Sequence, residues 1–274
     1  MKRALFVLAC VAACSAPKTE PPDAGQRPPL TSVKHAHNDY EHTRPLFDAL
    51  DHHFESVEAD IWFDGSDGGS ALGVAHDGPP FKGSLQALYL EPLKARLAAN
   101  NSSVYGDGKD FYLWLDLKDS SSALQDELVR ELSQYDFLTL FPDTGDPMKK
   151  AITVVLTGGG AKVDLVNRPA PRPYIRDGEP YSASDPPADG KWGYYAVFYY
   201  DYLQWVGDGT EMPKTQVRIM EDLIAGAHAK GRKIRIYSSP DVPAYWNAAL
   251  DAGEDFVNAD DLAGLEAAYD AYSR

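Results

Sequence analysis

The most constraining feature of the sequence is a repeated alternation of short strand-like runs and apolar stripes at helical spacing. Leu124, Leu128 and Leu132 form one such stripe. This order is typical of a parallel sheet covered by helices, and at this chain length it favours a single-domain (β/α)8 barrel of the TIM type, not necessarily a regular one, over an open sheet. The expected strands are 32–37, 56–63, 72–76, 111–118, 152–157, 195–202, 233–237 and 255–258. The expected helices begin after Thr43, at 120–122, near 215 and around 244.

Charged residues interrupt two of these strands on one face. Glu58 and Asp60 are two positions apart, and Asp116 stands two positions before Lys118. Side chains two apart on a strand point to the same side, so we expect these groups inside the barrel, where carboxylates are costly unless a positive charge neutralises them. A divalent cation on Glu58, Asp60 and Asp116 meets that need, and we expect magnesium rather than calcium. The alternative for Asp116 and Lys118 is a buried ion pair with a purely structural role.

Three histidines lie at the ends of the first strands. His35 and His37 share one face of the run 32–37, and His76 ends the run 72–76. The carboxyl ends of the strands carry the active site in a barrel of this kind. Two histidines can share the proton transfers of phosphodiester cleavage near neutral pH, and a cation offsets the charge on the phosphoryl oxygens. This pattern favours phosphodiester chemistry, whereas a lone histidine is more often a structural residue.

In this order the motifs resemble those of the phospholipase-C-like phosphodiesterase superfamily, which includes glycerophosphodiester phosphodiesterases and sphingomyelinase D. The His-x-His-Asn-Asp-Tyr opening and the C-terminal stretch most resemble the group named after altered inheritance of mitochondria. The segments that carry the resemblance are 35–40, 57–61, 75–77, 115–118, 227–231, Arg235 and 258–261. They span most of 33–262.

The resemblance implies a metal-dependent phosphoric diester hydrolase that acts on a phospholipid-derived or glycerophosphodiester-like substrate. The paired catalytic histidines of the superfamily fall on His37 and His76, and attack by a neighbouring substrate hydroxyl would give a cyclic phosphate. Asn38 and Asp39 stand where glycerophosphodiesterases carry Arg-Gly, so a phosphate-binding arginine is missing there. The metal carboxylates fall on Glu58, Asp60 and Asp116. The expected substrate-binding residues are His35, Asn38, Lys118 and Arg235.

The charge of the chain narrows the range of partners. Lys and Arg number 26 against 41 Asp and Glu, which gives a net charge of -15 at pH 7. A chain with this charge repels nucleic-acid backbones and anionic bilayers as a whole. We therefore expect no nucleic-acid partner, a small phosphodiester or a lipid as the ligand, and a monomer.

The N-terminal segment has the pattern of a bacterial lipoprotein signal. Two basic residues precede a small apolar run that ends at Cys14 and is too short to span a bilayer. This pattern predicts removal of residues 1–13, lipidation of Cys14 and anchoring to a bacterial cell envelope on its periplasmic or surface face. An ordinary signal peptide that leaves Cys14 free is the alternative. The proline-rich residues 14–31 indicate a tether, so we expect the barrel in 32–274.

Two alternatives stay open at this point. The run 192–205 holds eight aromatic residues, which form either a rim that receives a lipid or choline-like headgroup or a strand that fills the core. The function also has an alternative, in which a catalytically weak envelope lipoprotein binds a phosphorylated ligand at the same site. A polysaccharide-cleaving barrel is disfavoured because Glu58 and Asp60 share one strand face, whereas that reaction needs carboxylates on opposite sides of the scissile bond.

Overall fold

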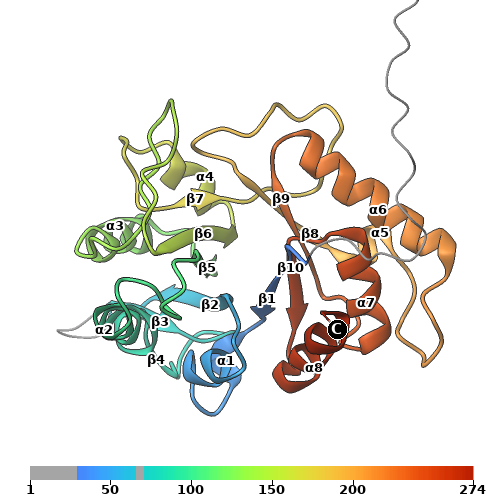
Figure 1. Ribbon diagram of the computed structural model, residues 1–274. Coiled ribbons are helices and arrows are strands. Elements are labelled where there is room, and N and C mark those ends of the chain that lie inside the picture. The colour runs from blue at the N-terminus through green and yellow to red at the C-terminus, as the bar shows by residue number, and fades with distance from the viewer. Residues whose placement is uncertain (1–29, 66–70, 274) are drawn as a thin grey trace, which may run out of the picture.

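Eight parallel strands form a nearly closed barrel in the computed structural model, which describes residues 30–65 and 71–273 (Figure 1). Around the ring the order is β7, β6, β5, β2, β1, β10, β9, β8. A parallel bridge between Arg176 and Trp192 joins the two ends of this order. The expected single-domain (β/α)8 barrel is therefore confirmed. The eight strands are β1 (Val33–Ala36), β2 (Ser56–Phe63), β5 (Phe111–Leu117), β6 (Ile152–Gly158), β7 (Ile175–Arg176), β8 (Tyr194–Phe198), β9 (Lys233–Tyr237) and β10 (Phe256–Ala259).

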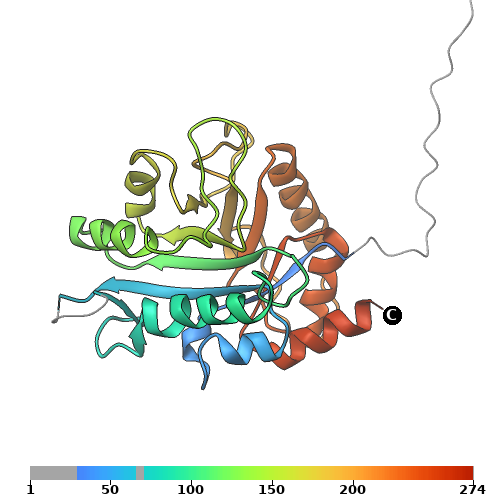
Figure 2. The same ribbon diagram turned by 60° about the vertical axis from the view of Figure 1, so that its left-hand side comes forward.

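Helices cover the outside of the ring, and a small antiparallel extension continues β2 (Figure 2). The extension consists of β3 (Leu72–Val74), which pairs with β2, and β4 (Gly83–Ser84), which pairs with β3. The helices are η1 (Asp39–Glu41), α1 (Phe47–Asp51), η2 (Gln86–Leu90), α2 (Glu91–Ala99), α3 (Ser122–Leu132), α4 (Ala161–Val166), α5 (Tyr199–Tyr202), α6 (Lys214–Ala229), α7 (Pro243–Ala252) and α8 (Leu262–Tyr272).

Two apolar layers stabilise this arrangement. The larger layer lies between the strands and the helices and includes the stripe of α3, whose Leu124, Leu128 and Leu132 are fully buried. The smaller layer fills the interior of the barrel with aromatic rings, and Trp114 packs edge-on against Tyr194 and Phe256. Because bulky rings occupy the lower interior, polar groups that point inward gather above them, toward the carboxyl ends of the strands.

The strand register sets the height of these polar groups. Glu58 on β2 lies opposite Trp114 on β5, and Asp60 lies opposite Asp116, one inward position closer to the carboxyl end. On the other side of β5, Asp116 lies opposite Thr157 of β6. Parallel pairing therefore places the acidic positions of two strands side by side, directly above the aromatic layer.

Several elements differ from the sequence-based expectation. The run 195–202 is not one strand, because β8 ends at Phe198 and the buried Tyr199 begins α5, where its hydroxyl donates to the Trp205 carbonyl. The helix expected after Thr43 begins only at Phe47, since Pro45 disfavours helical backbone before it and Leu46 has a φ of 65°. The sequence patterns did not indicate β7, α2, α4 or α8.

The helix start expected at 120–122 is confirmed by the cap of α3. Ser121 precedes α3, and its Oγ accepts a hydrogen bond from the Leu124 N–H at 3.1 Å. This bond satisfies one of the amide groups that a helix leaves unpaired at its first turn. The capping serine therefore fixes where the chain leaves the loop after β5, close to the charged end of that strand.

Glu254 couples the stability of the barrel to pH. The carboxyl group is fully buried and accepts hydrogen bonds from the Ile236 N–H and the Tyr245 hydroxyl, yet burial raises its pKa to about 8. The folded state then holds a proton that the unfolded chain releases near pH 4.3. The contribution of Glu254 to stability is therefore fully present below that pH and is lost as pH rises toward about 8. Glu254→Gln should remove this part of the slope, which reaches at most about 1.4 kcal/mol per pH unit.

Urea denaturation at pH 6 and pH 8 measures that slope. The matched control is Glu221→Gln, which removes an exposed carboxylate of α6 and should leave the wild-type slope in place. Equal slopes in wild type and Glu254→Gln would contradict a protonated Glu254 in the folded protein.

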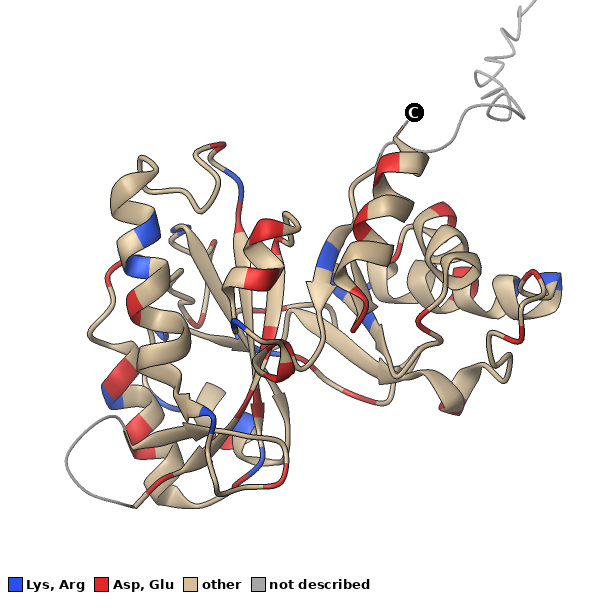
Figure 3. Cartoon of the chain, turned by 90° about the horizontal axis from the view of Figure 1, so that it is seen from below, with Lys and Arg blue, Asp and Glu red and all other residues tan. Residues whose placement is uncertain are grey.

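Within residues 30–65 and 71–273, the helices are all too short or too polar to cross a membrane. Lys and Arg positions are interspersed with Asp and Glu on helices and strands alike (Figure 3). The predicted signal segment 1–13, the lipidation of Cys14 and most of the tether 14–31 lie outside the described residues.

Candidate active site

His37 and His76 line one pocket at the carboxyl ends of the strands, and a carboxylate holds one ring nitrogen of each. His37 Nδ1 lies 2.9 Å from Asp260 Oδ1, and His76 Nδ1 lies 3.0 Å from Asp60 Oδ2. Because an ionised carboxylate only accepts hydrogen bonds, both contacts favour the tautomer with the proton on Nδ1. In each ring Nε2 is then the nitrogen available to exchange a proton.

The environment of His37 favours its charged form. Burial lowers the pKa of the ring, but the hydrogen bond to Asp260 and the negative charge of Glu58 outweigh burial, so the pKa is raised. Glu58 Oε2 lies 3.8 Å from His37 Nε2. The ring therefore keeps its proton to a higher pH than a free histidine does, which suits proton exchange near neutral pH.

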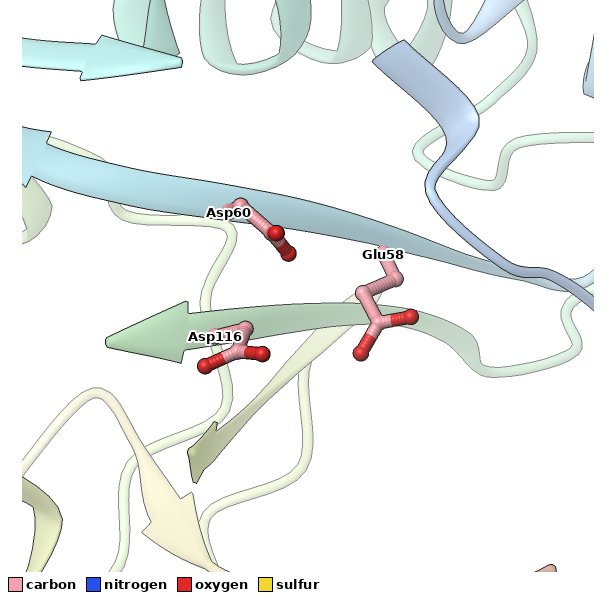
Figure 4. A group of neighbouring side chains, drawn as sticks. All are labelled: Glu58, Asp60 and Asp116. Carbon is pink, nitrogen blue, oxygen red and sulfur yellow. The ribbon is translucent and has the colours of Figure 1, made fainter. Parts of the chain in front are cut away.

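Three carboxylates from two neighbouring strands converge beside these histidines (Figure 4). Glu58 and Asp60 project from β2 and Asp116 projects from β5, and one ligand oxygen of each lies within 4.8 Å of the others. Asp60 is almost fully buried. Burial raises the pKa of Asp60, and the charges of Glu58 and Asp116 raise it further against the effect of Lys118.

The donor set fits a divalent cation. Asp60 Oδ1 is buried and has no hydrogen-bond partner, although Asp60 Oδ2 accepts from several groups. An orphaned carboxylate oxygen inside a cluster of three acids is costly, and a hard cation relieves both the missing bond and the mutual repulsion. Glu58, Asp60 and Asp116 are therefore the residues that would hold it.

Two basic side chains already neutralise part of this charge. Lys118 Nζ lies 2.8 Å from Asp116 Oδ2 and 3.0 Å from Asp60 Oδ2. Arg235 Nη2, from β9, contacts both oxygens of Glu58 at 2.9 and 3.0 Å, and both side chains are 3% exposed. Although burial opposes it, the guanidinium holds the pKa of Glu58 well below its usual range. Three carboxylates against two cations leave one net negative charge.

His35 lies below the pocket and not at its wall. The ring is fully buried, its Nδ1 lies 2.7 Å from Ser56 Oγ, and its edge packs against Trp114. Burial and the nearby Arg235 lower the pKa of His35 to about 3, so the ring is neutral. In this place His35 supports Glu58 from beneath, with Nε2 at 3.8 Å from Glu58 Oε2.

Asn38 turns the chain at the mouth of the pocket. Its φ of 46° and ψ of 44° are left-handed, a conformation that asparagine tolerates better than most residues. The Tyr40 hydroxyl lies 3.0 Å from Asn38 Oδ1 and 2.8 Å from Asp60 Oδ2. Tyr40 therefore ties the loop after β1 to the carboxylates of β2, a contact that the sequence pattern did not indicate.

The pocket has a volume of about 480 Å³ and draws its walls from several strand ends. Five of its lining residues were not among the expected site residues, because nothing in the local sequence marks them as such: Thr157, Gly158, Glu179, Tyr237 and Ser238. The lining residues are His37, Asn38, Glu58, His76, Asp116, Lys118, Thr157, Gly158, Glu179, Arg235, Tyr237 and Ser238.

Gly158 makes room for Asp116 at the end of β6. A Cβ at this position would collide with Asp116 Oδ1, and the backbone φ of +76° is one that residues with side chains rarely adopt. The glycine therefore lets the end of β6 approach the carboxylate of Asp116 on β5.

The aromatic run 192–205 serves mainly in packing. Tyr194 fills the barrel interior, Tyr195 and Tyr199 belong to the outer core, and the Trp192 ring stacks on the Arg232 guanidinium at 3.8 Å. Phe198 differs, because its ring lies 5.6 Å from that of Tyr237 at the pocket wall. The core-filling alternative therefore describes most of this run.

Residues 28–175 match the family described as the AIM6-like phosphodiesterase domain. The match covers more than half of the 274 residues and includes both histidines, all three carboxylates and Lys118. The chain belongs to the AIM6-like phosphodiesterase domain family. Relatives of this AIM6-like protein include altered inheritance of mitochondria protein 6 from Eremothecium gossypii, 27% identical over 86% of this chain and 68% of that protein. The protein of the same name from Saccharomyces cerevisiae is 24% identical over 83% and 68%.

Solved structures support the fold of this AIM6-like barrel. A candidate glycerophosphodiester phosphodiesterase from Galdieria sulphuraria superposes with a TM-score of 0.53 at 14% identity and covers 89% of this chain and 99% of that chain. A glycerophosphodiester phosphodiesterase from Parabacteroides distasonis gives 0.54 at 13% identity with the same coverage. At these identities the likeness concerns the fold alone.

One expectation is wrong. The sequence pattern predicted a bacterial cell envelope, but the altered inheritance of mitochondria proteins that this chain matches come from yeasts. A short basic and apolar leader occurs in several targeting signals, so the pattern alone did not identify the compartment.

Proposed function

We propose that this AIM6-like protein is a metal-dependent phosphoric diester hydrolase that acts on a phospholipid-derived or glycerophosphodiester-like substrate. The observation that carries the proposal is a pocket lined by two carboxylate-held histidines, His37 and His76, and by Glu58 and Asp116 of the three-carboxylate cluster. Proton transfer and charge neutralisation are the two needs of phosphodiester cleavage, and the pocket holds residues for both.

Glu58, Asp60 and Asp116 would hold a divalent cation, and magnesium suits their oxygen ligands. When bound, the cation offsets the negative charge that builds on the phosphoryl oxygens. Lys118 and Arg235 add fixed positive charge at the pocket wall. With a divalent cation bound as well, the net charge of this cluster would become positive, so the pocket would attract a phosphodiester anion although the chain as a whole is acidic.

The histidines divide the proton transfers. His37 Nε2 takes the proton of the attacking hydroxyl, which comes from water or from the substrate itself, and the new P–O bond forms. The P–O bond to the leaving group breaks as His76 Nε2 gives that oxygen a proton. A neighbouring substrate hydroxyl yields a cyclic phosphate and an alcohol, whereas water yields a phosphomonoester and an alcohol.

One contact favours the alternative of a binding protein without turnover. Lys118 bridges Asp60 and Asp116 at 3.0 and 2.8 Å and neutralises them without any cation. If this ion pair is permanent, the barrel would bind a phosphorylated ligand at the same pocket and leave it intact.

Hydrolysis of bis(p-nitrophenyl) phosphate, glycerophosphodiesters and lysophospholipids by the protein with magnesium, calcium or chelator separates the two. We expect turnover that a chelator removes and that falls at least 10²-fold in Asp116→Asn, because a lost ligand weakens cation binding. Asp136→Asn, an exposed acid outside the pocket, is the matched control. Turnover that resists chelator, or that survives in Asp116→Asn, would rule out the metal-dependent proposal.

A further inference from the structure

Asp260 stands directly after β10, outside the carboxylate cluster, and contacts His37. We propose that Asp260 is a positioning residue that holds His37 in the tautomer with the proton on Nδ1, so that the lone pair of Nε2 faces the pocket. The inference rests on the proposed function only for its kinetic consequence, since the tautomer is a property of the protein alone.

The contact geometry fixes which nitrogen is protonated. Asp260 Oδ1 lies 2.9 Å from His37 Nδ1, a normal length for a charge-assisted hydrogen bond. On the opposite side of the ring, Nε2 faces Glu58 Oε2 at 3.8 Å, which is too long for a hydrogen bond. One nitrogen is therefore bound and the other is free to meet a reacting oxygen.

Asp241 anchors the turn that carries Asp260. The carboxylate of Asp241, which follows β9, accepts hydrogen bonds from the backbone N–H groups of Asp260 at 3.1 Å and of Asp261 at 2.7 Å. The backbone N–H of His37 donates a hydrogen bond to the Ala259 carbonyl at 3.1 Å. The ends of β9, β10 and β1 are thus joined in series, and His37 is held through both its backbone and its ring.

The arrangement at His37 parallels the one at His76. The Nδ1 atom of His76 also meets a carboxylate, that of Asp60, which belongs to the candidate metal cluster. Asp260 is 68% exposed and lies outside that cluster. Its effect can therefore be removed without touching a candidate metal ligand, which makes the role of the tautomer separable from the role of the cation.

The direct test is nitrogen-15 NMR of the histidine rings in the metal-free protein at a pH where they are neutral. His37→Gln identifies the signal of His37. We expect a protonated Nδ1 in the wild type and a shift toward protonated Nε2 in Asp260→Ala, because no carboxylate then favours Nδ1. A wild-type ring protonated on Nε2, or a tautomer unchanged in Asp260→Ala, would overturn the inference.

The kinetic test uses bis(p-nitrophenyl) phosphate. We expect Asp260→Ala to lower kcat by about 10- to 100-fold with KM nearly unchanged, because the base is misoriented while binding is retained. Since the position is exposed, added formate should enter the space and restore part of kcat. A kcat that stays within about 2-fold of wild type, or a loss that formate leaves as it is, contradicts the positioning role.

The matched control is Asp261→Ala in the same turn. Asp261 caps α8 by accepting a hydrogen bond from the Gly264 N–H at 3.0 Å. This variant should lower the melting temperature but keep the wild-type tautomer and kcat. If the wild type fails to hydrolyse any phosphodiester, the proposed function fails, while the NMR result still decides the inference about Asp260.

Discussion

Alanine at His37 is expected to lower kcat for phosphodiester hydrolysis by about 10²- to 10⁴-fold, and alanine at His76 by a similar factor. Each ring has its Nδ1 held by a carboxylate and faces the same pocket, so each variant removes one of the two proton transfers. Both side chains are at least partly exposed, so neither variant should unfold the barrel. Steady-state kinetics with bis(p-nitrophenyl) phosphate, beside melting temperatures, measures both effects.

The double variant sharpens this prediction. If His37 and His76 serve one reaction, removing both should cost far less than the product of the two single losses, because residues that act as a unit are not additive. His228→Ala is the matched control, since His228 pairs with Asp255 just before β10 and lies outside the pocket. Turnover that survives in either single variant would sink the assignment of the two histidines.

The barrel could be predicted because its signal is periodic and local. Alternation on strands such as 56–63 and 111–118 fixes which side chains face inward, and the parallel topology brings the ends of neighbouring strands together. The convergence of Glu58 and Asp60 with Asp116 follows from these two facts. The structure places their oxygens within 4.8 Å.

The helices and strands that the sequence did not predict lacked such a periodic signal. β7 is only two residues long, too short to alternate, and α2 mixes charged and apolar residues without a clear stripe. At the end of β8 the aromatic pattern continues unchanged across Phe198 while the backbone turns into a helix. Side-chain type alone does not mark that switch, because aromatic residues fill strands and helix interfaces alike.

The partners of the site residues could not be predicted because they are remote in sequence. Asp260 lies 223 positions from His37, and Arg235 lies 177 positions from Glu58. The expected role of Arg235 was a phosphate contact, and its strand and face did follow from alternation. That its guanidinium meets Glu58 depends on the closure of the barrel, which brings β9 across from β2.

The ion pair of Arg235 and Glu58 gives the prediction with the largest effect on stability. Arg235→Met should lower the free energy of unfolding by about 3–5 kcal/mol, because it leaves the buried Glu58 carboxylate without its partner. The methionine retains the volume of the side chain above Trp114, so the loss reports mainly on charge. Urea denaturation of the metal-free protein measures it, and Arg44→Met, which breaks an exposed pair with Asp48, should leave the midpoint nearly unchanged.

The double variant Glu58→Gln with Arg235→Met tests whether charge is the cause. Removing both charges should recover much of the stability that Arg235→Met alone loses, since an uncompensated buried ion costs more than the pair contributes. Added magnesium should likewise stabilise Arg235→Met more than it stabilises the wild type, because a cation held by Glu58, Asp60 and Asp116 would replace the missing positive charge. If the double variant is no more stable than Arg235→Met, the guanidinium stabilises the barrel through packing and not through Glu58.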